Sequence, residues 1–190
     1  MSGTLTPGFA DPVADAQLCF RSVLDAMARP GRVHHVSGVE PPAPLCVAAS
    51  AALLTLVDHD TPLWLDPAAD TARAWIAFHC GAPFAVPSQS AFALGLAMPD
   101  LQTLSAGTHE TPETSATLIL QVASLTAGRR YRLSGPGLRT SAILSVDGLP
   151  VAFVEAWQRN HALFPCGIDL ILCAGDHLAA LPRTVTVQEA

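Results

Sequence analysis

The 190-residue sequence predicts one α/β domain, residues 1–190, in which an open mixed sheet is flanked by helices. Two observations predict this fold. Segments with apolar residues at helical spacing alternate with short apolar runs that are typical of buried strands. Some of these runs also follow one another closely enough to form hairpins, so the sheet is expected to contain antiparallel as well as parallel pairs.

The first helix is predicted over residues 11–29. Asp11 has a side chain suited to the N-cap, and Pro12 suits the first helical position. The dipeptide Pro30-Gly31 is expected to end the helix. The apolar residues that share one helical face, and that we expect to point into the core, are Phe20, Val23, Leu24 and Met27.

Several elements are expected in the next part of the chain. They are a short strand over 32–36, a buried helix over 45–57, a strand over 61–65, a helix over 71–80, a strand over 91–96 and a short helix over 101–104. The helix over 45–57 is predicted to be buried because it is apolar on nearly every side. The strand over 61–65 places Leu63 and Leu65 on one face and Trp64 on the other.

A hairpin is predicted in the middle of the chain. The run 117–125 is apolar and rich in β-branched residues, as buried strands are. Ala127-Gly128 is expected to turn the chain, so that residues 130–134 return beside the first strand. The glycines and proline at 135–137 then form a loop.

The C-terminal part is predicted to contain one helix and two strands. The helix is expected over 151–161, and the strands over 168–174 and 183–187. The residues of this helix that we expect to face inward are Val151, Val154 and Trp157.

The composition points to protein partners. Half of the residues are hydrophobic and only 14% are charged, whereas about 25% is usual for soluble domains. A surface that is poor in charge is typical of a chain that is covered by other subunits, although alanine-rich coding bias would have the same effect. The net charge of −6 provides no general attraction to nucleic acid.

No membrane segment is expected. The longest apolar run, 45–57, is shorter than the roughly 20 residues that a membrane-spanning helix needs. The first residues also lack the basic and apolar regions of a signal peptide. We therefore expect the protein to be cytoplasmic.

The sequence contains no lysine, since all ten of its basic residues are arginine. A GC-rich genome is a sufficient origin for this bias, but the chemical consequence holds in either case. A chain without a lysine side chain cannot form an internal Schiff base with pyridoxal phosphate, and it lacks the lysines of a Walker A loop and of a protein kinase.

Clusters that would suggest a metal or a nucleophile are weak. Asp58-His59-Asp60 supplies potential metal ligands, but metal sites need three or four ligands and no second cluster has suitable spacing, so we favour a helix-ending turn. No metal and no cofactor are therefore predicted. The five cysteines are interpreted as small buried residues, and they are Cys19, Cys46, Cys80, Cys166 and Cys173.

Two charged features remain as candidates. Arg129, Arg130 and Arg132 lie on the predicted hairpin, where Arg130 and Arg132 share a strand face and would form an anion clamp. The alternative is a solvated or partner-facing edge, because charged residues also protect edge strands. Asp169 interrupts an apolar strand, and we favour a structural role at the strand end, held by backbone N–H groups or an arginine.

Several stretches, taken in order over residues 9–185, resemble the PhnH family, one of the component families of the bacterial carbon–phosphorus (C–P) lyase core complex. These stretches are Pro12-Val13, Asp15-Ala16-Gln17, Phe20-Arg21, Ala26-Met27, Pro30-Gly31, Asp60-Thr61-Pro62-Leu63-Trp64-Leu65, Ser115-Ala116-Thr117-Leu118-Ile119-Leu120-Gln121-Val122, Leu133-Ser134-Gly135-Pro136-Gly137, Phe164-Pro165, Gly167-Ile168-Asp169-Leu170-Ile171-Leu172 and Leu181-Pro182-Arg183-Thr184. Because the stretches are long and ordered, together they are more specific than any single motif.

The resemblance implies a function in phosphonate use. It implies a core complex with C–P lyase subunits G, I and J, which replaces the adenine of ATP with methylphosphonate to give ribose 1-methylphosphonate 5-triphosphate. It also implies a homodimer outside the complex, and a fold similar to the PLP-dependent transferase fold but without PLP. The family supplies no established catalytic residue, so Asp60, Thr61, Arg132 and Asp169 are only structural or interface candidates.

Three functional hypotheses follow. The first is a subunit with a structural or assembly role and no self-contained active site. The second is a small-molecule enzyme or binder that holds a phosphonate or nucleotide on the Arg129–Arg132 hairpin. The third is a degenerate pyridoxal-phosphate-type scaffold with an unrelated role.

Overall fold

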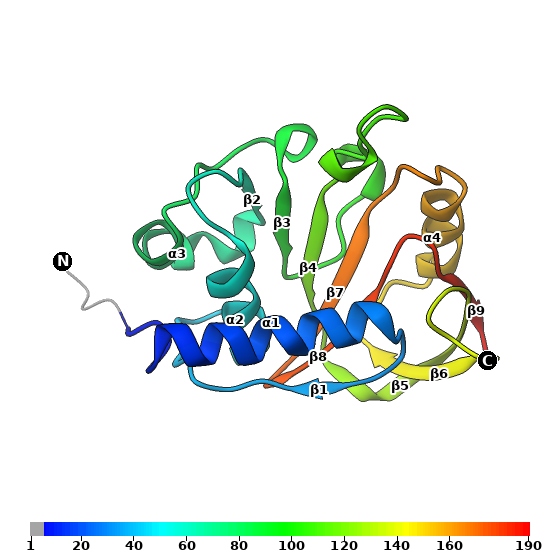
Figure 1. Ribbon diagram of the computed structural model, residues 1–190, viewed down its shortest axis with the longest axis horizontal. Coiled ribbons are helices and arrows are strands. Elements are labelled where there is room, and N and C mark those ends of the chain that lie inside the picture. Colours follow the sequence, from blue (N-terminus) through cyan, green and yellow to red (C-terminus); the bar gives the residue numbers. More distant parts are fainter. Residues whose placement is uncertain (1–5) are drawn as a thin grey trace.

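The computed structural model describes residues 6–190 and consists of two sheets with helices on both sides of the larger one (Figure 1). The α-helices are α1 (Pro12–Ala28), α2 (Val47–Leu56), α3 (Arg73–Cys80) and α4 (Phe153–His161). Short 3-10 helices are η1 (Pro67–Ala72), η2 (Pro87–Gln89), η3 (Leu101–Thr103) and η4 (Pro112–Thr114). The strands are β1 (His34–His35), β2 (Leu63–Leu65), β3 (Phe92–Gly95), β4 (Thr117–Gln121), β5 (Ser124–Ser134), β6 (Ala142–Asp147), β7 (Asp169–Ala174), β8 (His177–Leu181) and β9 (Thr186–Glu189).

The larger sheet has the strand order β1-β8-β7-β4-β3-β2. Strands β2, β3, β4 and β7 are parallel, and β8 and β1 continue the sheet in antiparallel fashion. Along β4, Ile119 packs on the side of α1, α2 and α3, whereas Leu118 and Leu120 pack on the side of α4 and the smaller sheet. The predicted mixed sheet flanked by helices is therefore confirmed.

Helix α2 is buried as its composition predicted. Ala48 through Leu53 are buried along the whole of its first two turns. The side chain of Gln121, at the end of β4, anchors the segment before the helix: its Oε1 accepts from the backbone N–H of Cys46 at 2.6 Å, and its Nε2 donates to the carbonyl of Pro44 at 3.2 Å. These two hydrogen bonds hold the start of α2 against the carboxyl end of the parallel strands.

The predicted hairpin of 117–125 with 130–134 is wrong. Strand β4 pairs with β3 and β7, and the chain leaves the larger sheet after Gln121. Strand β5 instead forms the middle of the three-stranded sheet β6-β5-β9, with antiparallel partners on both sides. The apolar run is buried, as predicted, but burial on both faces equally fits the centre of a parallel sheet.

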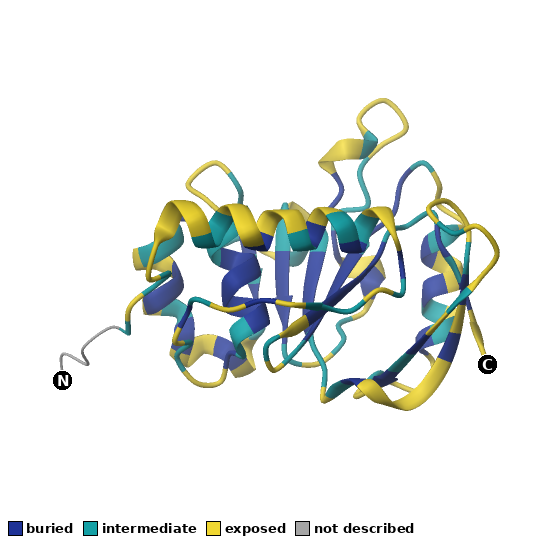
Figure 2. Ribbon diagram, turned by 60° about the horizontal axis from the view of Figure 1, so that its bottom comes forward, coloured by how far each residue is buried: buried dark blue, intermediate teal, exposed yellow. Residues whose placement is uncertain are grey.

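Helix α1 has the predicted limits, including the cap, because the Asp11 carboxylate accepts from the backbone N–H groups of Val13 and Ala14. The predicted core face is only partly correct. The buried residues of the helix are Cys19, Val23 and Ala26, and Met27 packs against them. The large residues that face solvent are Val13, Leu18, Phe20 and Leu24. Figure 2 shows this exposed side along the length of the helix.

The C-terminal elements differ in detail from expectation. Helix α4 buries Phe153, Trp157 and Asn160, whereas Val151 precedes the helix and is 76% exposed, so its predicted inward orientation is wrong. Strands β6 and β8 are additional to the predicted elements. Among residues 6–190, no helix is long and apolar enough to cross a bilayer.

Candidate functional site

The carboxyl ends of parallel strands are where α/β proteins usually bind ligands. In this chain two polar side chains at that edge, those of Asp66 and Gln121, already have backbone partners. Asp66, which follows β2, accepts from the backbone N–H of Ala68 at 2.9 Å and from that of Leu96 at 3.0 Å. Gln121 is held by the segment before α2, as described above. These two side chains therefore join loops to the sheet and are not free to bind a ligand.

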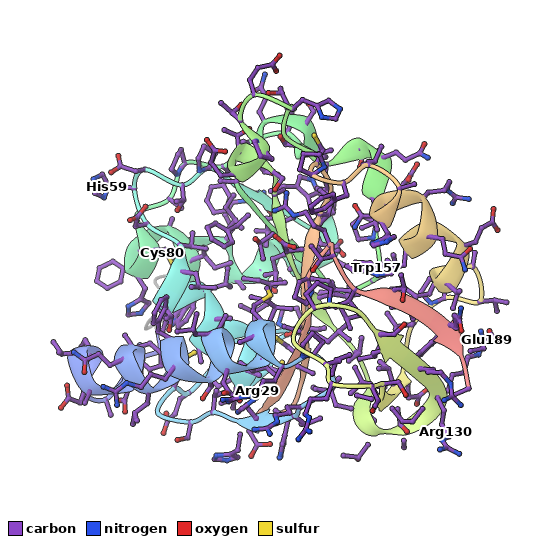
Figure 3. All side chains as sticks on the ribbon, turned by 45° about the vertical axis from the view of Figure 1, so that its right-hand side comes forward. Arg29, His59, Cys80, Arg130, Trp157 and Glu189 are labelled. Atoms are coloured by element: carbon purple, nitrogen blue, oxygen red, sulfur yellow. The ribbon has the colours of Figure 1, made fainter. Side chains whose placement is uncertain are left out.

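The segment Asp58-His59-Asp60 forms a turn, as the sequence favoured. The Asp58 carboxylate accepts from the Asp60 backbone N–H at 3.0 Å and from the Thr61 hydroxyl at 3.1 Å. The hydrogen bond from Asp60 is the main reason why the pKa of Asp58 lies below its usual value. His59 points outward at the periphery (Figure 3). Within residues 6–190, no group of three or more acidic, histidine or cysteine side chains is arranged to hold a metal ion.

Several of the histidines make local structural contacts. His161 Nδ1 lies 2.9 Å from the carbonyl of Arg183, and His79 Nε2 lies 3.1 Å from the carbonyl of Thr6. His35 and His177 contact opposite oxygens of the Asp176 carboxylate, at 3.2 and 2.6 Å. The two contacts with Asp176 join β1, β8 and the turn between β7 and β8.

The cysteines are free thiols. Cys19, Cys166 and Cys173 are buried, as predicted, whereas Cys46 and Cys80 are only half-buried. Burial raises the pKa of Cys19, Cys46 and Cys173, and it raises the pKa of Cys80 to about 11. A high pKa leaves little of the nucleophilic thiolate at neutral pH. This environment is the opposite of the one that activates a catalytic cysteine.

We predict that Cys80 in the native protein reacts with iodoacetamide at pH 8 about a hundredfold more slowly than free cysteine, because its thiolate fraction is lowered by that factor. Mass spectrometry of the alkylated peptides measures this rate. In urea all five cysteines should react at the normal rate. Rapid alkylation of native Cys80 would show that burial does not raise the pKa of this thiol.

Asp169 is paired with Arg183, as the sequence reasoning favoured. Asp169 is the first residue of β7. Its carboxylate accepts hydrogen bonds from Arg183 Nη2 at 2.5 Å, from Arg183 Nε at 3.2 Å and from the Arg183 backbone N–H at 2.8 Å. The same guanidinium also donates to the carbonyl of Pro112 at 3.0 Å. The side chains of the pair are only 21% and 15% exposed, so the ion pair joins β7, the segment before β9 and η4 in a largely dry environment.

The three candidate arginines all lie on β5, but they do not form one clamp. Arg130 and Arg132 alternate with the buried Tyr131 and are exposed on the outer face of the smaller sheet. Arg129 lies on the same side of the strand as Tyr131, but unlike Tyr131 it is exposed. None of the three forms an ion pair within the described part of the chain.

Sequence reasoning missed the surroundings of Tyr131, the single tyrosine of the chain. Its side chain is 2% exposed and packs edge-to-face on Phe153, with ring centroids 5.4 Å apart. Burial raises its pKa, the nearby Arg129 guanidinium opposes this, and Glu189 adds to it. Glu189 is opposite Tyr131 in the register of β5 and β9, and Figure 3 shows Arg130 and Glu189 on these neighbouring strands.

Comparison with known proteins identifies the family. The chain matches the model of the bacterial phosphonate metabolism protein (PhnH) over residues 7–188. It belongs to the PhnH family. A PhnH protein of Rhizobium meliloti (strain 1021), the alpha-D-ribose 1-methylphosphonate 5-triphosphate synthase subunit PhnH, is 43% identical over 187 residues, which cover 95% of this chain and 94% of that protein.

A second relative is more distant. The putative C-P lyase subunit protein HtxG of Stutzerimonas stutzeri is 33% identical over 180 residues, covering 90% of this chain and 85% of that protein. Both relatives are described as subunits of larger enzymes. The PhnH-family resemblance seen in the sequence is thereby confirmed.

Proposed function

We propose that this chain is the PhnH-type subunit of a ribose 1-methylphosphonate 5-triphosphate synthase in a carbon–phosphorus lyase pathway. The observation that carries the proposal is the 43% identity over 95% of the chain to a subunit of that name. The named partners are C–P lyase subunits G, I and J, and outside the complex the chain forms a homodimer. The proposal places the protein in the cytoplasm and its fold near that of the PLP-dependent transferases.

The contribution of this subunit is proposed to be structural rather than catalytic. Asp58, Asp66 and Asp169 are engaged in turns, caps or ion pairs, and the described cysteines have raised pKa values or are buried. Groups that are used to hold the fold are poorly placed to react with a substrate. The subunit therefore acts mainly through the surface that it presents to its partners.

The outer side of α1 is the surface that we propose for subunit contact. Phe20 and Leu24 are 50% and 58% exposed and lie four residues apart, so they are neighbours on the same side of the helix. Arg21 adjoins them beside a hollow of about 270 Å³ and is without an ion pair among residues 6–190. An apolar row beside an unpaired guanidinium suits a partner segment that carries large apolar and acidic side chains.

The test is co-purification with subunits G, I and J, followed by synthase assays with and without this chain. We expect the double variant Phe20→Ser and Leu24→Ser to weaken assembly at least about thirtyfold, as loss of an interface anchor does. Phe78→Ser is the matched control, because Phe78 is 70% exposed on a different helix. Turnover of ATP and methylphosphonate by this chain alone would refute the assembly role. Equal losses in both variants would refute the assignment to α1.

A further inference from the structure

We propose that the edge of strand β6 that faces away from β5 binds an extended, antiparallel segment of a partner protein, with acidic side chains on one face of that segment. Strand β6 is an outer strand of the smaller sheet, and among the described residues it pairs with β5 alone (Figure 1). The added segment extends this sheet by one strand. The inference does not rest on the synthase proposed above, because the binding groups all belong to this chain.

The register of the smaller sheet determines which backbone groups of β6 face this edge. The backbone N–H of Ala190 donates to the carbonyl of Arg130, so the backbone of Arg130 faces β9. Hydrogen-bonded and non-hydrogen-bonded positions alternate along an antiparallel ladder. The residue after Arg130 therefore faces β6 and bonds with its partner there, Leu144. The N–H and C=O groups of Ile143 and Ser145, on either side of Leu144, point away from β5 to the free edge.

These outward groups are unpaired. The backbones of Ile143 and Ser145 form no hydrogen bond with a segment outside the β5–β6 ladder in the described part of the chain. Such a row of donors and acceptors is a template for another strand, so proteins usually protect it with charge, proline or a covering loop. Residues 142–146 contain no proline and no charged side chain, and Ile143 is 39% exposed. The edge therefore lacks the usual protection.

The other strand edges in residues 6–190 are short or covered. Strand β1 has two residues, and β9 has four, the last of which is the charged Glu189. Beside β2 the chain returns, so that the N–H of Leu63 donates to the carbonyl of Pro83 and its carbonyl accepts from the N–H of Ala85. Strand β6 has six residues and neither kind of protection. This contrast indicates that its edge is kept open for a partner.

The arginines of the neighbouring strand define the charge of that partner. Arg130 is opposite Ser145 and Arg132 is opposite Ile143, and both arginines are exposed on the outer face of the sheet. Neither forms an ion pair within the described residues, and Asp147 at the end of β6 pairs with neither. A strand added beside β6 lies about 10 Å from β5. Arginine and glutamate side chains that extend toward each other span this gap.

The expected segment therefore has an alternating pattern. Residues that hydrogen-bond with Ile143 and Ser145 share their face of the sheet, so acidic side chains at these positions lie on the same side as the two arginines. The residues between them lie on the side of Leu144 and Val146, which are buried, so they are expected to be apolar. A second copy of this chain fits less well, because it brings two more arginines to the outer face and only Asp147 as an acid.

The test uses a synthetic peptide of six residues, the length of β6, in which glutamate and valine alternate and both ends are blocked. It is titrated into the full-length protein labelled with ¹⁵N. We expect saturable shifts of the backbone amide signals of Ile143 and Ser145, and slower hydrogen exchange at both. In an antiparallel pair the glutamate N–H groups face β6 and the valine N–H groups face away.

Two modified peptides separate backbone pairing from charge. Methylation of the glutamate N–H groups should weaken binding at least about tenfold, because it removes the donors to β6, whereas methylation of the valine N–H groups should change it little. A peptide with lysine in place of glutamate should also bind at least about tenfold more weakly, because it places cations beside Arg130 and Arg132.

Variants of the protein provide the matched controls. Ser145→Pro removes an outward N–H but no bond of the ladder, so the sheet should remain while binding falls at least about tenfold. Glu189→Pro removes an outward N–H at the opposite edge of the same sheet and should leave binding unchanged. The double variant Arg130→Gln and Arg132→Gln keeps the edge intact. It should remove the preference for glutamate over lysine, and it decides the outcome if Ser145→Pro does not fold.

The proposal is overturned if the glutamate peptide gives no saturable shift, if methylation of its glutamate N–H groups leaves binding unchanged, or if the double arginine variant retains the full preference for glutamate. Equal binding by folded Ser145→Pro and Glu189→Pro would also overturn it. Dimerisation of the chain that is lost in Ser145→Pro would show that a second copy occupies the edge, against the acidic segment proposed.

Discussion

Trp157→Ala is expected to lower the free energy of unfolding by about 3–5 kcal/mol, the range for loss of a buried tryptophan. Trp157 is completely buried on α4, and its indole Nε1 donates to the carbonyl of Val185 at 2.8 Å. It also packs on Phe153, with ring centroids 6.1 Å apart. The substitution therefore leaves a cavity between α4 and the two sheets as well as an unpaired carbonyl.

Urea denaturation followed by circular dichroism measures this loss. Trp157→Phe fills most of the cavity but still leaves the Val185 carbonyl unpaired, so it should lose about 1–3 kcal/mol. Val151→Ala is the control at the start of the same segment, and because Val151 is exposed it should change stability by less than about 0.5 kcal/mol. A large effect at Val151 with a small one at Trp157 would contradict the orientation of α4.

Arg183→Met is expected to lower the free energy of unfolding by about 3 kcal/mol, because it leaves the Asp169 carboxylate largely buried without its partner. The carbonyls of Pro112 and Pro165 lose a donor at the same time. The double variant Asp169→Leu with Arg183→Met should be less destabilised than the sum of the two single variants, because no charge is then stranded.

A double-mutant cycle in urea gives the coupling energy of this pair. The comparison is Arg159→Met, which breaks the exposed contact between Arg159 and Glu155 on α4. Exposed pairs contribute about 0–1 kcal/mol. Additive effects at Asp169 and Arg183, or an equal loss at Arg159, would show that the inner pair does not have the role that its burial indicates.

Helices α1 and α2, on one side of the larger sheet, could be predicted from sequence because each has a strong local signal. Asp11 and Pro12 mark the start of α1, and the uniform apolarity of 45–57 marks a buried helix. The pairing of strands could not be predicted in the same way. The run 117–125 passes from one sheet to the other within a few residues, and periodicity contains no information on which strand becomes the neighbour.

Strands β6 and β8 escape prediction because they are short and their apolar residues form no long run: Ser145 interrupts β6, and β8 has two small alanines. Strand β8 contains two alanines and begins at an exposed histidine, and it is buried by the neighbours that tertiary structure supplies. In α1, hydrophobicity suggests Phe20 and Leu24 as core residues, but the small residues Cys19 and Ala26 are the ones that approach the sheet. A residue type can indicate a contact without indicating whether it is made within the chain or with a partner.

The candidate site was only partly predictable. The arginines of β5 are visible in the sequence, and the shared face of Arg130 and Arg132 follows from strand alternation. The same alternation places Arg129 on the other side of the strand, with Tyr131, but the sequence does not reveal that β5 pairs with β6 and β9. Tyr131 is isolated in the sequence, and its unsatisfied hydroxyl is a property of the packed structure alone.

The inverted size pattern of α1, with alanine and cysteine inside and phenylalanine and leucine outside, has a consequence for how the protein is made. If this side of α1 is the subunit contact proposed above, molecules made in excess of their partners expose these apolar side chains to water and are prone to aggregate or to be degraded. Matched synthesis of all the subunits would keep that population small. The purified free subunit should also be retained strongly on a phenyl column, and mixing it with its partners should release it.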